Sequence, residues 1–183
     1  IRSSINPEKN FKIPFDQPTI NFNDEDLLVK ACFEYLKQFG VKRNKVFNAV
    51  KKSFDEYRKF KNQIQIKGAE IISKAKDEGR YLVVLSGRPY HIDQLINQKT
   101  PDALCDLGVD VITEDAVPFY GKDYLSQLHV ITQWAYTNRI YNAAKWVADQ
   151  NHKVQLIQIN SFGCGPDSIV IDENSEILKV KSK

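Results

Sequence analysis

The chain has 183 residues, of which 42% are apolar and 27% are charged, as in ordinary soluble globular proteins. No apolar run approaches the roughly 20 residues that cross a bilayer, and the first residues lack the pattern of a secretory signal. This composition argues against a membrane protein or a secreted one, so we expect a cytoplasmic protein of bacterial type.

The formal net charge of +3 is unevenly distributed. Residues 1–80 carry 17 Lys and Arg against 11 Asp and Glu, whereas residues 81–183 carry 9 against 12. A basic helical region attracts nucleic acid or cofactor phosphates. Between Lys42 and Lys76, however, the lysines alternate with an apolar stripe, which favours a solvated helix face. We therefore expect no nucleic-acid partner.

The chain has an odd number of widely separated cysteines, Cys32, Cys105 and Cys164. This argues against a disulfide framework and, for the cysteines alone, against a closed four-ligand metal site. Cys32 and Cys105 lie in apolar helical patterns, so we expect both to be buried structural residues. The chain starts at Ile1 and contains no methionine, which favours a piece of a longer polypeptide.

The first two predicted regions are an extended arm and a helical segment. Residues 1–22 contain three prolines, which predict an extended arm without a helix. Residues 23–78 form the helical segment. Its first helix is capped at Asn23-Asp24 and ends at Gly40. Its second helix runs from about Lys42 to Asp77 and has an expected length of about 50 Å, at a rise of about 1.5 Å per residue.

Residues 79–183 form the third predicted region, in which strands alternate with helices. The expected strands are 81–86, 109–113 and 154–159, and the expected helices lie around 102–107 and from about 122 to 150. The tail after residue 168 fits a short helix or a strand. This alternation predicts an α/β fold, a Rossmann-like parallel sheet of three to four strands with flanking helices.

The loop after the first strand reads SGRPYHID. Gly87 favours a sharp turn, and Arg88 with nearby backbone N–H groups is suited to hold a phosphate or carboxylate. His91 titrates near neutral pH. In the alternative interpretation, Arg88 pairs with Asp93 or caps a strand end.

The loop after the last strand reads NSFGCGPDS. Gly163 and Gly165 leave the backbone on both sides of Cys164 without side chains, so a cluster or an electrophile has access to its sulfur. The backbone N–H groups of Ser161 and of other loop residues can stabilise the negative charge of a thiolate. Asp167 or Ser168 is expected to cap a helix. The alternative is a small cysteine turned inward in a tight turn.

Other polar residues are weaker candidates. Glu114 and Asp115 follow the second strand, and we expect helix capping or solvation for both. In the alternative interpretation, the two adjacent carboxylates perturb each other's pKa or bind a metal. Asn138 and Arg139 lie among aromatic residues of the long helix, where they either face a ligand or point outward. His129 is placed on the same helix.

Four strings occur in order, SGRPYHID, LGVDVITEDAV, QWAYTNRIYNAAKWVA and QINSFGCGPDS, and they resemble blocks of the acyl-CoA dehydratase activase-related proteins. These bacterial proteins, labelled CoA-substrate-specific enzyme activase, are related to 2-hydroxyglutaryl-CoA dehydratase and benzoyl-CoA reductase. The resemblance covers about residues 80–178.

This resemblance implies a fragment of a large protein that combines ATPase activator domains with Rossmann-like lobes holding an iron–sulfur cluster. Cys164 matches a family cysteine that ligates such a cluster, which implies a 4Fe-4S cluster in the full-length parent and electron transfer driven by ATP. The implied partners are other domains of the parent and an acyl-CoA substrate. The fragment alone is not expected to be an active enzyme.

A second hypothesis makes the chain a non-catalytic module for a small ligand or for domain docking. In that interpretation Gly87, Arg88, His91, Ser161, Gly163 and Gly165 hold an anionic ligand or a neighbouring domain. Both hypotheses place the important residues in the same two loops.

Overall fold

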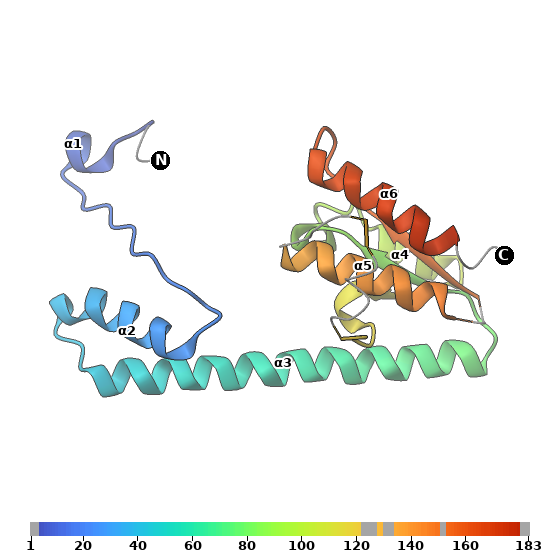
Figure 1. Ribbon diagram of the computed structural model, residues 1–183, viewed down its shortest axis with the longest axis horizontal. Helices are drawn as coiled ribbons and strands as arrows, with labels where there is room; N and C mark the ends of the chain where they lie inside the picture. The colour runs from blue at the N-terminus through green and yellow to red at the C-terminus, as the bar shows by residue number, and fades with distance from the viewer. Residues whose placement is uncertain (1–3, 122–127, 130–133, 151–152, 180–183) are drawn as a thin grey trace. The chain divides into compact units, whose positions relative to one another are not determined.

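The computed structural model describes residues 4–121, 128–129, 134–150 and 153–179 (Figure 1). Packing divides the chain into two compact units, residues 1–60 and residues 61–183, which we describe separately. Among the helices of the described residues, none has both the length and the apolar character needed to cross a membrane.

The first unit is a helical hairpin preceded by an arm. Helix α2 (Glu25–Leu36) begins at Asp24, whose carboxylate accepts a hydrogen bond of 2.9 Å from the Leu27 backbone N–H. A 3-10 turn, η1 (Lys37–Phe39), ends at Gly40 with a φ of 75°, and α3 (Arg43–Asp77) follows. The predicted cap, stop and second helix are confirmed.

The arm contains a helix that the sequence analysis did not predict. Helix α1 (Pro7–Phe11) starts with its proline at the first helical position, where the missing N–H costs nothing and the fixed φ favours a helix. The Asn6 side chain accepts a hydrogen bond from the Lys9 backbone N–H. The expectation that proline excludes a helix here was therefore wrong, although residues 12–22 have no regular structure.

The second unit is an α/β fold with a parallel sheet, as predicted. The strands are β1 (Leu82–Ser86), β2 (Asp110–Thr113) and β3 (Val154–Gln158), in the order β2-β1-β3. In the register, Val84 of β1 lies beside Ile112 on one side and Leu156 on the other. The connections contain η2 (Pro89–Ile92), α4 (Thr100–Asp106), η3 (Glu114–Ala116) and α5 (Ala135–Ala148), and α6 (Gly165–Lys179) follows β3.

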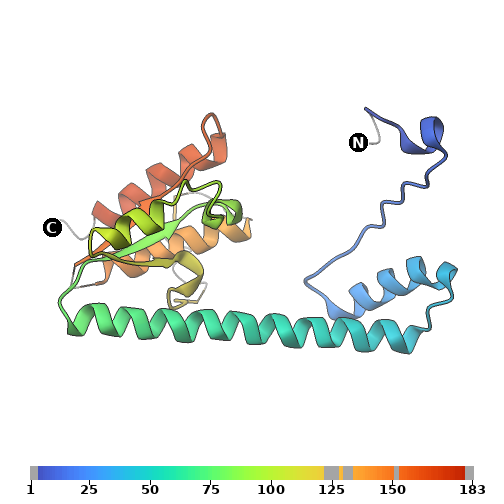
Figure 2. The same ribbon diagram turned by 180° about the vertical axis from the view of Figure 1, so that it is seen from behind.

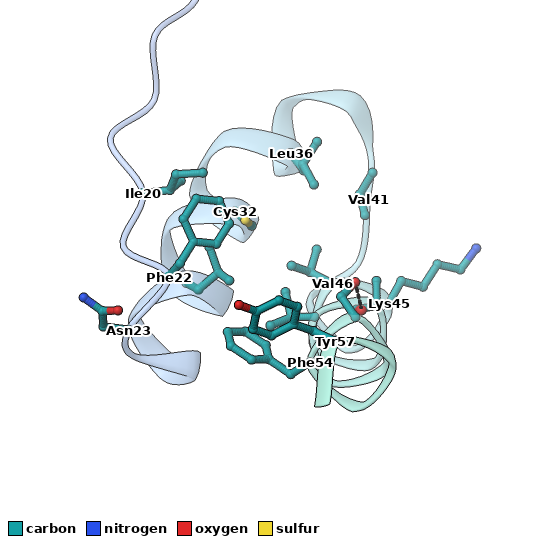
Figure 3. A pocket seen from close by; sticks show the side chains of 14 residues that line it. Ile20, Phe22, Asn23, Cys32, Leu36, Val41, Lys45, Val46, Phe54 and Tyr57 are labelled. Atoms are coloured by element: carbon teal, nitrogen blue, oxygen red, sulfur yellow. Dashed lines mark hydrogen bonds between the residues drawn. The ribbon is translucent and has the colours of Figure 1, made fainter. Parts of the chain in front are cut away.

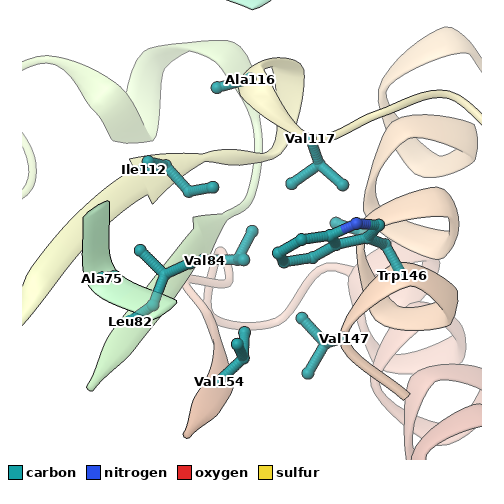
Figure 4. Packing of buried hydrophobic residues seen from close by; sticks show 10 residues of the cluster. Ala75, Leu82, Val84, Ile112, Ala116, Val117, Trp146, Val147 and Val154 are labelled. Atoms are coloured by element: carbon teal, nitrogen blue, oxygen red, sulfur yellow. The ribbon is translucent and has the colours of Figure 1, made fainter. Parts of the chain in front are cut away.

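Helices cover both faces of this sheet. The two opposite views show α5 and α6 on one side and α4 on the other (Figures 1 and 2). In the main core, Val84 of β1 points toward Trp146 and Val147 of α5 (Figure 4). Ala75, near the end of α3, belongs to the same cluster. Continuous burial of β1 explains why its sequence is an uninterrupted apolar run.

Two predicted helices differ from those observed. The long helix was expected from residue 122, but Leu128 and His129 lie in a bend and α5 begins only at Ala135; residues 122–127 and 130–133 lie outside the described part. Helix α4 is short and exposed, so Cys105 is exposed where burial was expected. Cys32 is half-buried.

The predicted tail resolves into α6, a helix that packs against α5. The predicted domain limits, after residues 22 and 78, follow the ends of elements, whereas the division by packing falls inside α3. The three-region division stays a prediction.

Candidate functional site

The sheet topology identifies one edge of the second unit as the place for a site. The chain passes from β1 to β2 on one side and then to β3 on the other side of β1. The direction of winding therefore reverses between β1 and β3, and open α/β sheets bind ligands beyond the carboxyl ends of the strands at such a reversal. The loops that follow β1 and β3 are the two that the sequence analysis selected.

A charged cluster joins these two loops. Arg88, in the loop after β1, donates from Nε to both carboxylate oxygens of Asp167 at 3.1 and 3.3 Å, and its Nη2 lies 3.1 Å from Oδ1. The same Nη2 donates to the sulfur of Cys164 at 2.6 Å. One guanidinium thus binds a carboxylate and a cysteine from the opposite loop, which fixes its position.

Gly87 and His91 shape the loop that presents Arg88. A Cβ at position 87 would lie 2.8 Å from the carbonyl oxygen of Ile159, so only glycine allows the two loops to approach this closely. The buried His91 ring accepts a hydrogen bond of 3.0 Å from the Arg88 backbone N–H through Nδ1. Burial lowers the pKa of His91, and the Arg88 charge acts in the same direction, while Asp167 opposes it.

The loop after β3 is organised by Asp167, in the first turn of α6. Its Oδ2 accepts a hydrogen bond of 2.8 Å from the Ser161 backbone N–H, so the carboxylate closes the loop as well as binding Arg88. Asp167 is only 5% exposed. Burial acts to raise the pKa of Asp167, but the hydrogen bonds from Arg88 and Ser161 outweigh it, and the pKa is lowered.

Cys164 lies at the end of this loop with glycine on either side. Its backbone N–H donates to the Ser161 carbonyl at 3.2 Å, and Gly163 has a φ of 72°, the left-handed conformation that glycine adopts without strain. A Cβ at Gly165 would meet no neighbouring atom within 4 Å. The half-buried sulfur therefore lies in a turn whose flanking positions carry no side chains.

Two tyrosines complete the cluster. The Arg88 guanidinium lies 5.2 Å from the centre of the Tyr136 ring, and the Tyr90 hydroxyl is 2.5 Å from the Ser161 hydroxyl. The Tyr136 hydroxyl is buried and has no hydrogen-bond partner within the part of the chain that the structure describes. Burial raises the pKa of Tyr136, although the Arg88 charge opposes the change.

A second polar pair follows β2. Glu114 is 5% exposed and lies 3.8 Å from Arg139 of α5, between Oε1 and Nε. Burial raises the pKa of Glu114 to about 7, although Arg139 opposes the change. The expectation that Glu114 is solvated or caps a helix was wrong, because η3 turns its side chain inward against α5.

The structure brings together five of the seven predicted site residues: Gly87, Arg88, His91, Ser161 and Cys164. Gly163 and Gly165 belong to the same loop and shape it without a side chain. In the described structure the partner of Arg88 is Asp167, while Asp93 accepts from the Leu95 backbone N–H. The ligand and cluster roles of these residues stay predictions.

Sequence reasoning missed the parts played by Asp167 and Tyr136. Asp167 was expected to cap a helix, and no pattern along the chain connects it with Arg88, 79 positions away. Tyr136 was one of several aromatic residues in a helix. The acidic residue in the first turn after a glycine-rich loop was the one available signal.

The potential metal ligands are sparse. Across the described ranges, no group of three or more His, Cys, Asp or Glu side chains is arranged to hold a metal ion. Cys32 belongs to the first unit, and Cys105 lies on α4, so Cys164 is the one cysteine in the loop cluster.

Comparison with protein families assigns the larger part of the chain to a family. Residues 1–117 match a family described as the CoA enzyme activase uncharacterised domain (DUF2229). Neither a search of curated proteins nor a search of solved structures found a match. The family match includes the first unit, β1, β2 and the Arg88 loop, while the Cys164 loop lies beyond it.

Proposed function

Since the chain belongs to the CoA enzyme activase uncharacterised domain family, we propose that it is one domain of a larger CoA-enzyme activase-type protein. In this proposal Cys164 is a ligand to an iron–sulfur cluster of the 4Fe-4S type in the full-length parent. The parent acts on an acyl-CoA, as a 2-hydroxyacyl-CoA dehydratase-like enzyme, with electron transfer driven by ATP hydrolysis in other domains.

The observation that carries this proposal is the contact between Arg88 and the sulfur of Cys164. Cluster ligands are thiolates, and hydrogen bonds to their sulfur atoms tune the reduction potential of the cluster. Arg88 supplies a donor and a positive charge beside the sulfur, and Asp167 holds the guanidinium in that place. Gly163 and Gly165 leave room for a bulky inorganic group.

The described residues supply only part of a cluster site. A 4Fe-4S cluster is held by about four thiolates, and this loop offers one. The remaining ligands therefore belong, in this proposal, to other segments of the parent. When bound, the cluster would pass single electrons at low potential, while the chain itself orients Cys164 and places Arg88 against its sulfur.

The test is the iron and acid-labile sulfide content of the full-length parent, purified without oxygen, together with its visible absorption spectrum. The proposal predicts a brown protein with iron and sulfide in equal amounts. A colourless parent with less than one iron per ten chains would overturn it.

One observation favours a second candidate, a site for a small anion. The Tyr136 hydroxyl has no hydrogen-bond partner in the described structure and lies in the cluster with Arg88, so the two side chains offer donors to a phosphate or carboxylate. Tyr136→Phe removes this donor without leaving another group of the described residues unpaired. Calorimetric titration with CoA should then show weaker binding than in the wild type, and identical titrations would exclude this candidate.

A further inference from the structure

The first unit contains an apolar pocket that the proposed function does not use. It has a volume of about 830 Å³ and is bounded by the end of the arm, by α2 and by the first part of α3 (Figure 3). Apolar side chains such as Leu36, Val46 and Phe54 form most of its wall. Its volume is within the range of about 300–1,000 Å³ that is typical of small-molecule sites.

The polar groups of this pocket lie mainly at its edge. Lys45 belongs to the wall, but its aliphatic stem leaves the apolar side chains and its ammonium group points away from them (Figure 3). Lys52 lies seven residues later on the same side of α3, two helical turns along. Lys45 therefore places one positive charge at the pocket edge, and Lys52 adds a second along the same side of the helix.

The charged side chains at the start of α3 are all positive. Residues 42–52 contain five Lys and Arg and no Asp or Glu. Among the described residues, Lys45 and Lys52 have no ion-pair partner. The acidic residues Glu25 and Asp26 instead line a separate hollow, of about 210 Å³, with Lys51. The pocket edge thus offers positive charge that no carboxylate of the unit neutralises by direct contact.

We propose that this pocket binds a fatty-acid-type ligand, an unbranched aliphatic chain with a carboxylate head. The chain occupies the apolar space beside α2, and the carboxylate lies at the edge near Lys45 and Lys52. Cys32 belongs to the pocket wall, and Figure 3 shows its sulfur among the apolar side chains, so a bound chain covers it. This site is in a different unit from Cys164 and does not depend on the cluster.

Chain length tests the apolar part of the proposal. Binding of octanoate, decanoate and dodecanoate to the 183-residue chain is measured by calorimetry below their micelle concentrations. Each added CH2 group that is buried should tighten the dissociation constant by up to about fourfold. Equal affinity for the three chains, or no binding of any, would overturn the proposal.

Head-group charge tests the basic edge. The double variant Lys45→Gln/Lys52→Gln should weaken dodecanoate binding by about threefold to tenfold, the range for two solvent-exposed charge contacts. Binding of dodecanol, which has the same chain without the charge, should not change. The matched control is Lys74→Gln/Lys76→Gln, at exposed positions near the other end of α3. Equal losses in both double variants, or tighter binding of dodecyltrimethylammonium, would contradict the basic edge.

Labelling of Cys32 and substitution of Ala49 test whether the alkanoate lies in this pocket. Saturating dodecanoate should slow labelling of Cys32 by N-ethylmaleimide and leave labelling of the exposed Cys105 unchanged. Ala49→Leu fills space in the pocket wall and should weaken binding, whereas Asn48→Leu, exposed but outside the wall, should not. Protection of Cys32 by an acidic amphipathic peptide but not by any alkanoate would overturn the ligand in favour of a protein partner.

Discussion

The two units bury their apolar side chains in different ways. In the second unit, every residue of β1 is buried, and Leu82 and Val84 belong to a core cluster that also contains residues of α3 and α5. The polar side chains gather beyond the strand ends, where they bind one another. In the first unit, the two helices bury only Leu28, Val29, Val46 and Val50, and other apolar side chains line an open pocket. A sheet covered on both faces leaves function to its loops, whereas a helical hairpin leaves it to a hollow between helices.

The closed core of the second unit should give the largest effect on stability. Leu82→Ala removes a side chain that is 0% exposed in the middle of the sheet, and should lower the free energy of unfolding by about 2–5 kcal/mol. Leu107→Ala, at a leucine that is 79% exposed, should change it by about 0.5 kcal/mol or less. Denaturant titration followed by tryptophan fluorescence measures both, and equal losses would contradict the described core.

Removing the carboxylate that holds Arg88 should have the next largest effect. Asp167→Asn should lower the free energy of unfolding by about 1–3 kcal/mol, because a buried group loses its charged hydrogen bonds. The exposed Asp172→Asn, in the same helix, serves as the control.

The difference in stability between the wild type and Asp167→Asn should depend on pH, and this dependence tests the ion pair more sharply. The pKa of Asp167 is lowered from 3.8 in the folded state, so its stabilising contribution is present above pH 3.8 and is lost as pH falls through the folded pKa. The difference between wild type and Asp167→Asn should therefore shrink only below about pH 4. A difference that disappears near neutral pH would contradict the described ion pair.

Glu114 should show the opposite dependence on pH. Its pKa rises from 4.5 to about 7 on folding, so the folded state holds a proton that the unfolded state has lost. Stability should fall by up to about 1.4 kcal/mol per pH unit between pH 4.5 and 7 on account of this group. Glu114→Gln should flatten that part of the profile, while Glu70→Gln, exposed on α3, controls for the change of charge. An identical slope in the Glu114 variant would show that the carboxyl is not buried.

A substitution in the first unit should have the smallest effect on stability, and this effect should be confined to one helix. Asp24→Ala removes the cap of α2 and should cost about 0.5–2 kcal/mol of helix stability. Hydrogen exchange of the Leu27 amide, which donates to Asp24, should become faster, while amides of β1 keep their protection. Slower or unchanged exchange at Leu27 would show that this cap does not stabilise α2.

The sequence was most informative where local rules decide the structure. The Asp24 cap, the Gly40 stop and the uninterrupted apolar run of β1 each have a local cause, and their elements were predicted within one or two residues. Pro7 shows how a local rule can be applied too broadly. A proline ends a helix from the middle but favours one at the first position.

The site was predictable as a pair of loops but not as a set of contacts. Gly87 and Cys164 stood out because turns and open backbone have a visible pattern. The bond between Arg88 and Asp167 joins residues 79 positions apart, and it exists because parallel pairing brings β1 and β3 together. Burial of Glu114 depends in the same way on α5, which packs against η3 directly after β2. Long-range packing of this kind has no periodic trace in a single sequence.

Counting iron atoms per chain in three anaerobically purified forms of the full-length parent tests the role of Cys164 most directly. The forms are the wild type, Cys164→Ser and Cys105→Ser, the last replacing an exposed cysteine outside the loop cluster. The proposal predicts that Cys164→Ser loses iron while its circular dichroism stays that of the wild type, and that Cys105→Ser keeps its iron. Equal iron in all three would contradict the proposal that Cys164 ligates a cluster.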